Sequence, residues 1–239
     1  INFDTRIAPG LHTQIELLST MAKILELRGF EKEDVFFVTN RLETSLRKDL
    51  ENELQGYEII TSESENYYHP EWFHESPMPS SMGDLAELLI KYPNNSETRK
   101  EMERKSNLPA CLFLGDTYWI NLATAKDDYY IGIDGAVTNA TLNACSNTQR
   151  FRKDTTMGPA AASEILAIPE LLEKHLFSLI DLCEVQIAGS PTFNSEFVRQ
   201  QSFLLLSKNP VFLDYYAMHR ICMLRKMAGL LDKNPDKLK

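Results

Sequence analysis

Two apolar runs, FSLIDL at residues 177–182 and FLLLS at residues 203–207, lead into the sequence NPVFLD at residues 209–214. Between the two runs the chain is broken by Gly-Ser-Pro at residues 189–191. An Asn before Pro supplies a side-chain acceptor for the free N–H groups of a helix, and Pro is well tolerated at the first helical position. This order predicts an α/β fold with polar groups at the ends of its strands.

Upstream of these runs, helix and strand patterns alternate. Residues 12–28 carry apolar side chains at three- and four-residue steps, and leucines recur at every fourth position of residues 42–54, so both segments are expected to be helices. Residues 35–38 form the continuous apolar run expected of a parallel strand covered on both faces, and residues 57–61 are the next strand candidate. The alternation predicts a largely parallel sheet with helices on both faces.

The domain organisation follows from length and from breaks in this rhythm. A chain of 239 residues suits one large domain, since single cores of this size bury roughly 70–75% of the unfolded surface. We expect a single α/β domain over residues 1–239 with a polar insertion near residues 93–108. Within residues 160–176, Pro169 must interrupt a helix or start a second one.

Charge and hydropathy restrict the class of partner. A net charge of −9 argues against nucleic acid as the main partner, because nucleic acid favours proteins with clustered Lys and Arg. No apolar run approaches the ~18–20 residues of a membrane span. The chain begins at Ile1 rather than Met, so whether residues precede Ile1 stays open. We expect a soluble protein, cytoplasmic or exported after removal of a leader, and the sequence does not indicate its oligomeric state.

The four cysteines are far apart in the sequence. Cys111, Cys145, Cys183 and Cys222 include no C-x-x-C pair, the local spacing of common zinc and iron–sulfur sites. No iron–sulfur cluster is therefore expected. Cys183 and Cys222 lie in apolar patterns and are expected to be reduced thiols of the core.

Several short motifs are distributed along the chain, each occurring once. The sequence INLATAK at 120–126 is similar to I-N-x-P-x-x-K, AVTN at 136–139 to A-x-K-N, and NPVFLD at 209–214 to D-P-V-A-L-D. Residues 180–182 correspond to a V-D-A strand, and the helix pattern that starts at residue 12 is also similar. In these motifs the chain resembles the family catalogued as domain of unknown function 362.

The resemblance implies a site at the motif positions, and it implies that part of any charged site is missing here. Thr138 stands where the family usually has Lys, Asn209 where it has Asp, and Ala123 where it has Pro. Some relatives carry ferredoxin-like cysteine clusters, which this chain lacks. The resemblance carries no settled activity.

Five polar residues lie at the ends of predicted strands or at helix starts: Asn121, Lys126, Asn139, Asp181 and Asp214. Ligands of open α/β sheets bind outside the carboxyl ends of strands, where such residues can converge. We predict Lys126, Asp181 and Asp214 as catalytic and Asn121 and Asn139 as ligand-binding. In this hypothesis Lys126 binds an anionic group, and the carboxylates position a metal or accept a proton. The alternative is that both aspartates cap loops and helices and that Lys126 is solvated.

Residues 62–80 break the helix–strand rhythm and predict a long loop, which in compact domains is often a binding loop or lid. Tyr68 and Trp72 are candidate ligand-binding residues that could stack on a flat ligand or a sugar, or else anchor the loop over the core. His69, Glu71 and His74 could bind a divalent metal. Pro70 lies between the two histidines, however, and H-x-x-x-x-H is not an established metal spacing.

Two function classes follow. The first is a small-molecule-binding or metal-binding α/β protein, either a binder or an enzyme acting on an anionic substrate, with residues 66–79 covering its pocket. The second is a noncatalytic interaction protein whose contact surface is the aromatic segment 66–79. The first requires the five polar side chains at the strand ends to face one cavity.

Overall fold

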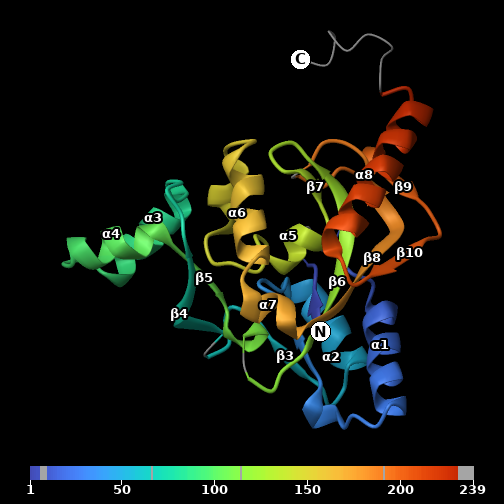
Figure 1. The fold of residues 1–239 in the computed structure, drawn as a ribbon, viewed down its shortest axis with the longest axis horizontal. Helices are drawn as coiled ribbons and strands as arrows, with labels where there is room; N and C mark the ends of the chain where they lie inside the picture. The colour runs from blue at the N-terminus through green and yellow to red at the C-terminus, as the bar shows by residue number, and fades with distance from the viewer. Residues whose placement is uncertain (6–9, 66, 114, 191, 231–239) are drawn as a thin grey trace.

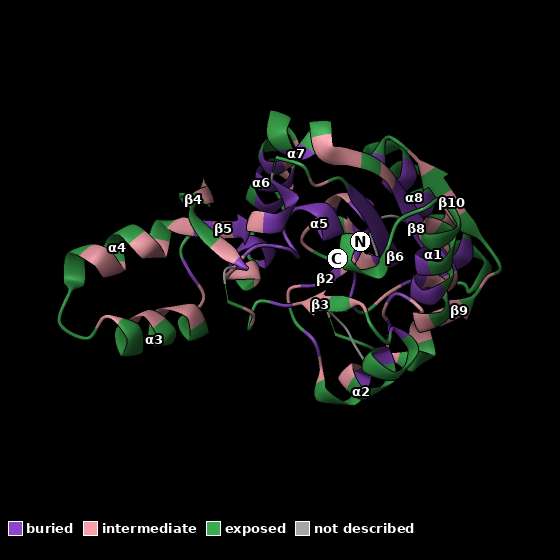
Figure 2. Ribbon diagram, turned by 90° about the horizontal axis from the view of Figure 1, so that it is seen from below, coloured by how far each residue is buried: buried purple, intermediate pink, exposed green. Residues whose placement is uncertain are grey.

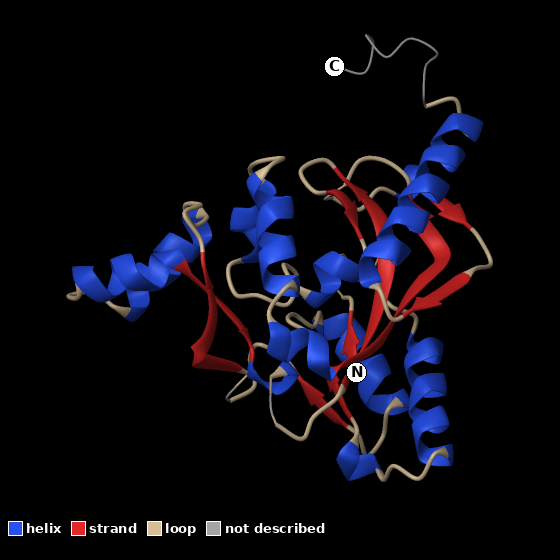
Figure 3. Ribbon diagram, in the orientation of Figure 1, coloured by secondary structure: helices blue, strands red, loops and turns tan. Residues whose placement is uncertain are grey.

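The computed structural model describes residues 1–5, 10–65, 67–113, 115–190 and 192–230 (Figure 1). An eight-stranded mixed sheet forms its centre, and helices cover both faces of the sheet (Figure 3). The α/β fold predicted from the alternating patterns is confirmed.

The sheet has the strand order β10-β8-β6-β1-β2-β3, with β7 paired to β6 and β9 paired to β8. Its strands are β1 (Asn2–Phe3), β2 (Phe36–Val38), β3 (Glu58–Ile60), β6 (Trp119–Asp128), β7 (Gly132–Asp134), β8 (His175–Gln186), β9 (Val198–Gln200) and β10 (Leu204–Ser207). The pairs among β1, β2, β3, β6 and β8 are parallel, whereas β7, β9 and β10 pair antiparallel. The parallel strands therefore bring their carboxyl ends to one edge.

The helices assigned in the described residues are α1 (Ile15–Leu27), α2 (Thr44–Glu53), α3 (Met82–Lys91), α4 (Ser96–Arg104), α5 (Ala136–Ala140), α6 (Met157–Leu166), α7 (Pro169–Lys174) and α8 (Pro210–Met227). The helices predicted from periodicity near residues 12–28 and 42–54 are confirmed as α1 and α2. Pro169 starts a second helix, and the Asn209 side chain accepts the N–H groups of Val211 and Phe212 at the start of α8.

Two hydrophobic clusters fix the helices to opposite faces of the sheet. On one face, Leu18 of α1 and Leu50 of α2 pack with Phe37 and Leu122. On the other face, Leu213 and the following turns of α8 pack with apolar residues of β6 and β8. None of the helices in the described part of the chain is long and apolar enough to cross a membrane.

The segment predicted as a long loop is a strand. Residues Tyr68–Glu75 form β4, which pairs antiparallel with β5 (Lys105–Pro109) in a separate two-stranded sheet. Between these strands, α3 and α4 project from the body, and neither helix has a buried residue (Figure 2). We call these two helices the α3–α4 arm. Pro70 and the charged residues of β4 hide the alternation that would have indicated a strand.

The central strand and one cysteine also differ from expectation. Residues 111–122 are an apolar run that also suggests a strand, but a short 3₁₀ turn lies at Ala110–Leu112 and β6 starts only at Trp119. All four cysteines are free thiols, but Cys222 is exposed on α8 and therefore does not belong to the core. Cys222 was expected in the core because its neighbours are apolar, but α8 also carries apolar residues on its exposed side.

Candidate functional site

A cavity of about 790 Å³ opens at the carboxyl ends of β1, β2 and β3. Asp4 and Thr5 follow β1, Thr39 and Asn40 follow β2, and Ser62 follows β3, and all of them line it. These strands are parallel, so the residues after them reach the same edge of the sheet. The hydroxyls of Thr5 and Thr39 lie 2.8 Å apart and connect two of the strand ends. The cavity therefore has a polar floor supplied by the sheet.

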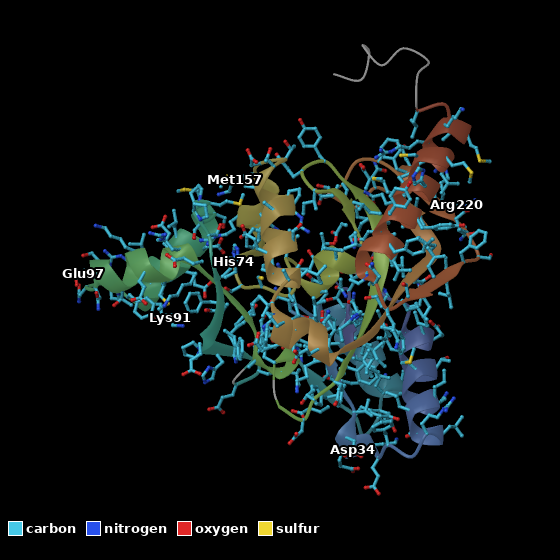
Figure 4. All side chains as sticks on the ribbon, in the orientation of Figure 1. Asp34, His74, Lys91, Glu97, Met157 and Arg220 are labelled. Atoms are coloured by element: carbon cyan, nitrogen blue, oxygen red, sulfur yellow. The ribbon has the colours of Figure 1, made fainter. Side chains whose placement is uncertain are left out.

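The facing wall comes from the α3–α4 arm and its two-stranded base. Glu87, Leu88 and Lys91 of α3 line the cavity, together with Tyr68 of β4 and Asn107 of β5. Figure 4 shows Lys91 on the projecting arm. The cavity thus lies between the sheet and the arm, and a ligand held there would touch both.

Amide side chains are frequent in the lining, among them Asn2, Asn40, Asn107, Asn139, Asn143 and Asn147. Some have a structural role. The amide of Asn40 donates to the carbonyls of Asn143 (2.9 Å) and Cys145 (2.7 Å), and its oxygen accepts from the Tyr68 hydroxyl (3.0 Å). These bonds hold the segment after β2 against the loop after α5.

A buried ion cluster lies directly behind the cavity floor. The Lys126 ammonium is fully buried, contacts the Asp4 carboxylate, and lies 3.8 Å from the Asp134 carboxylate. The Thr124 hydroxyl donates to Asp4 at 2.7 Å and accepts from Lys126 at 2.9 Å. Buried charges are tolerated when they are paired and hydrogen-bonded, and here the pairing holds Asp4 at the cavity.

The cluster continues to a second buried cation. Arg152 approaches Asp128 at 3.1 Å and Asp134 at 3.4 Å, and it donates to the Asn143 side chain at 2.7 Å. Burial lowers the pKa of the Arg152 guanidinium, while Asp128 acts in the opposite direction. Asn143 also lines the cavity, so the ion cluster supports a second stretch of its wall.

Asn121 and Asn139, both predicted to bind a ligand, lie together. The Asn139 amide donates to the Asn121 oxygen at 2.7 Å, and Asn2 approaches the same oxygen at 3.4 Å. The Asn121 amide donates to the Ala136 carbonyl (2.8 Å) and the Ser178 hydroxyl (3.0 Å). Asn139 lines the cavity, whereas Asn121 joins β6 to its neighbours behind it.

The three predicted catalytic residues are not gathered at the cavity. Lys126 is enclosed by carboxylates and is not open to an anionic ligand, which corrects the role predicted for it. Asp181 lies within β8, where its side chain accepts the backbone N–H of Cys183 at 2.8 Å. Asp214 accepts the backbone N–H groups of Ala136 (2.6 Å) and Val137 (3.0 Å) and so caps α5. Asp214 thus has the capping role considered as the alternative, whereas Asp181 makes a bond within its own strand.

Burial shifts the pKa of the Asp214 carboxyl group. Its carboxyl is almost completely enclosed, which raises its pKa from the ordinary 3.8 to about 7, although the N–H groups of Val137 and Ala136 act to lower it. Gly135 is required beside it, because a Cβ at that position would clash with a carboxylate oxygen of Asp214. The group is thus built into the start of α5 and takes no part in lining the cavity.

The three predicted metal ligands do not lie together. His69 Nδ1 lies 3.9 Å from Glu71 on an exposed stretch, but His74 turns away and bonds Glu164 Oε2 at 2.7 Å. No group of three or more side chains able to hold a metal ion occurs in the part of the chain that the structure describes. The hypothesis of a metal site at His69, Glu71 and His74 is corrected, because a strand directs these side chains to different neighbours.

Of the two predicted aromatic ligand contacts, one lies at the cavity. Tyr68 lines it, and burial raises the pKa of its hydroxyl well above the ordinary value. Trp72 instead stacks on Phe113, with ring centroids 4.3 Å apart and planes 13° from parallel. Trp72 therefore anchors β4 to the core, the alternative considered for these aromatics.

The sequence analysis missed the residues that form the cavity floor. Asp4, Thr39 and Ser62 each lie within two residues of the end of an apolar strand segment, and this position was a usable signal. Arg152 and Asp134 had no such signal, because their burial depends on contacts between distant segments. Of the five polar residues predicted at strand ends, Asn139 lines the cavity and the other four do not, so the requirement that all five face one cavity is not met.

The chain matches no protein-family model, and no curated protein is significantly similar to it. Its structure is similar to that of a Thermotoga maritima protein determined as a structural genomics target, with a TM-score of 0.42 and 15% sequence identity. The match covers 87% of this chain and 49% of that one, so the chain spans about half the length of that protein. The match carries no information on activity.

Proposed function

We propose that the chain binds a polar small molecule that carries an anionic group, in the cavity between the ends of β1–β3 and the α3–α4 arm. The observation that supports this most is the cavity of about 790 Å³ at the carboxyl ends of parallel strands. Small-molecule sites are typically clefts of ~300–1,000 Å³, and open α/β sheets bind ligands at this edge.

The chemistry of the walls indicates the class of ligand. Amide and hydroxyl side chains such as Asn107, Asn139 and Thr39 can donate and accept hydrogen bonds, which favours a ligand rich in oxygen or nitrogen atoms. Three cations also line the cavity: Arg41, Lys91 and Lys105. Four acidic residues, Asp4, Glu63, Asp84 and Glu87, line it as well, so an anionic group is expected to lie beside one of the cations.

Lys91 is the cation best placed for this role. Lys105 is already paired with Glu101 at 2.6 Å, and Arg41 lies 3.6 Å from Glu43. No ion pair of Lys91 is found among the described residues, and its ammonium lies over the ring of Tyr92 at 5.8 Å. A carboxylate or phosphate in the cavity would supply the missing counter-charge.

If the ligand is a substrate, Asp4 is the candidate reactive group. Asp4 is a lining residue of the cavity, and Lys126 and Thr124 bind its carboxylate. A positioned carboxylate can accept a proton from a bound hydroxyl. This would make the protein an enzyme, whereas binding alone needs only the walls.

The rival hypothesis, an interaction protein using residues 66–79, has less support. Tyr67 is buried, Trp72 is stacked on Phe113, and Phe73 lies under the Lys105 ammonium at 4.4 Å. The described aromatic side chains of this segment thus make contacts within the protein and are not free to form a surface for a partner. The resemblance to domain of unknown function 362 remains a prediction; two of its motif residues, Asn121 and Asn139, lie in contact.

A thermal-shift screen of carboxylate and phosphate metabolites tests the proposal. The best binder should raise the melting temperature of the wild type, and Lys91→Gln should weaken its Kd by about tenfold, the loss of one charge-assisted contact. Lys23→Gln on exposed α1 is the matched control and should leave the Kd unchanged. Equal Kd values for the wild type and both variants would contradict the assignment of Lys91.

A further inference from the structure

The free edge of the central sheet is unusually apolar. β10 is the last strand beyond β8 in the strand order, and the strand with the residue before it, 203–207, reads Phe-Leu-Leu-Leu-Ser, with no charge or proline. Proteins normally protect an edge strand with charges, proline or a covering element. An edge of this composition is suited to pairing with another strand.

The hydrogen-bonding pattern of β10 shows which of its groups are open. Phe203 accepts from the Leu182 N–H at 3.0 Å, so the peptide groups of Phe203 and Leu205 point toward β8. By antiparallel alternation, those of Leu204 and Leu206 point outward. The side chains of Leu204 and Leu206 are also 53% and 63% exposed. Both the backbone and the side chains of this edge are therefore available to a partner.

Helix α8 adds a second apolar surface beside the same edge. Its buried side holds Leu213 and Ala217, yet Phe212 and Tyr216 on the outer side are 60% and 50% exposed. The outer side of α8 therefore presents exposed aromatic side chains to solvent, and these are available to a partner.

Arg220 shows that these two surfaces adjoin. Its guanidinium donates to the Gln201 side chain at 3.1 Å and lies over the Phe203 ring at 4.7 Å (Figure 4). Tyr216 and Met223 are four and three residues away on the helix and so flank Arg220 on the same stripe. The stripe of α8 and the strand β10 therefore form one continuous face.

We propose that this face binds a second copy of the chain, with β10 pairing antiparallel to its equivalent across a two-fold axis. One operation then acts on the three features described above: the open peptides pair, Leu204 and Leu206 meet the same residues of the second copy on one side of the sheet, and α8 meets α8 on the other. A two-fold interface uses the same patch on both subunits, as this arrangement does.

The available area agrees with a stable pair. The residues concerned are Phe203, Leu204, Leu206, Phe212, Tyr216 and Met223, each between 40% and 63% exposed. At about 200 Å² per fully exposed large side chain, they contribute roughly 600 Å². This is most of the ~800 Å² that each partner supplies to a standard interface. The inference is independent of what the cavity binds.

Sedimentation velocity over a range of concentrations tests the proposal. The wild type should sediment at twice the 27.3 kDa of one chain. Leu206→Lys and Phe212→Glu, which place charges on the strand and on the helix, should each raise the dissociation constant at least tenfold. Leu27→Lys, at an 86% exposed position of α1, is the control and should remain dimeric. Circular dichroism would verify that all three variants are folded.

Hydrogen exchange separates this interface from any other. The amides of Leu204 and Leu206 should be protected in the dimer and should lose protection on dilution or in Phe212→Glu. A dimer whose β10 amides exchange freely would overturn the proposal, and so would a monomeric wild type. A monomer that floats with phosphatidylcholine vesicles would also overturn it, because the face would then belong to lipid.

Discussion

The Lys126 ammonium and the Asp4 carboxylate form a buried ion pair between residues 122 positions apart in the sequence. Asp4 follows the short strand β1, whereas Lys126 lies near the end of the long strand β6 beside it. The pair therefore fixes the end of β1 to the centre of the sheet. Because Asp4 lines the cavity, the same contact orients the cavity floor.

Replacing Lys126 with Met should strongly destabilise the protein. The substitution leaves Asp4 and Asp134 buried without their shared cation, and breaking a buried pair on one side typically costs ~3–5 kcal/mol. Urea denaturation would measure this loss, with Lys48→Met on exposed α2 as the control. Adding Asp4→Asn should recover part of the loss; a double variant as unstable as the sum of the single ones would contradict the pairing.

The stability contributed by Asp214 should fall as the pH rises. Its pKa is about 7 in the folded protein and ordinarily 3.8, so between these values the folded state binds more protons than the unfolded state. The difference in pKa corresponds to roughly 4 kcal/mol. Relative to Asp214→Asn, the wild type should therefore lose up to about this much unfolding free energy between pH 4 and pH 8.

Denaturation of both proteins at several pH values would measure this difference. A wild type that gained stability over Asp214→Asn with rising pH would show that the N–H groups of Ala136 and Val137 outweigh burial. The sign of the slope thus decides which effect dominates at Asp214.

Replacing Asn121 with Leu should cost roughly 3 kcal/mol. The change removes the acceptor of the Asn139 amide and the donor to the Ala136 carbonyl, and each buried polar group left unpaired costs ~1–3 kcal/mol. Chemical denaturation would measure it against Asn94→Leu, an exposed position in the turn between α3 and α4. If Asn121→Leu were as stable as Asn94→Leu, the predicted role of Asn121 would be contradicted, because water would then replace the hydrogen bonds that Asn121 makes.

The fold was predictable because its signals are local. The apolar spacing of α1 and α2, the Asn209–Pro210 start of α8 and the role of Pro169 each depend on a few neighbouring residues. β4 was missed because Pro70 and charges disguise a two-residue alternation. The largely parallel sheet was predicted, but not which of its strands pair antiparallel, since strand direction depends on connections rather than on composition.

The site was less predictable because burial depends on distant contacts. Lys126 beside two aspartates in the sequence resembles a solvated cation, yet β1 and β7 enclose it. Asp214 resembles a residue at a helix start, and only its contact with α5 gives it a shifted pKa. The sequence indicates which strand ends are polar, but only the packed structure shows which of them share a cavity.

A crystal structure of the chain with the best binder of the metabolite screen tests the central claim most directly. We expect density for the ligand between Thr39 and Asn139 on the sheet side and Lys91 on the arm, with the anionic group nearest the Lys91 ammonium. Ligand bound at another surface, with this cavity filled only by water, would contradict the proposed function.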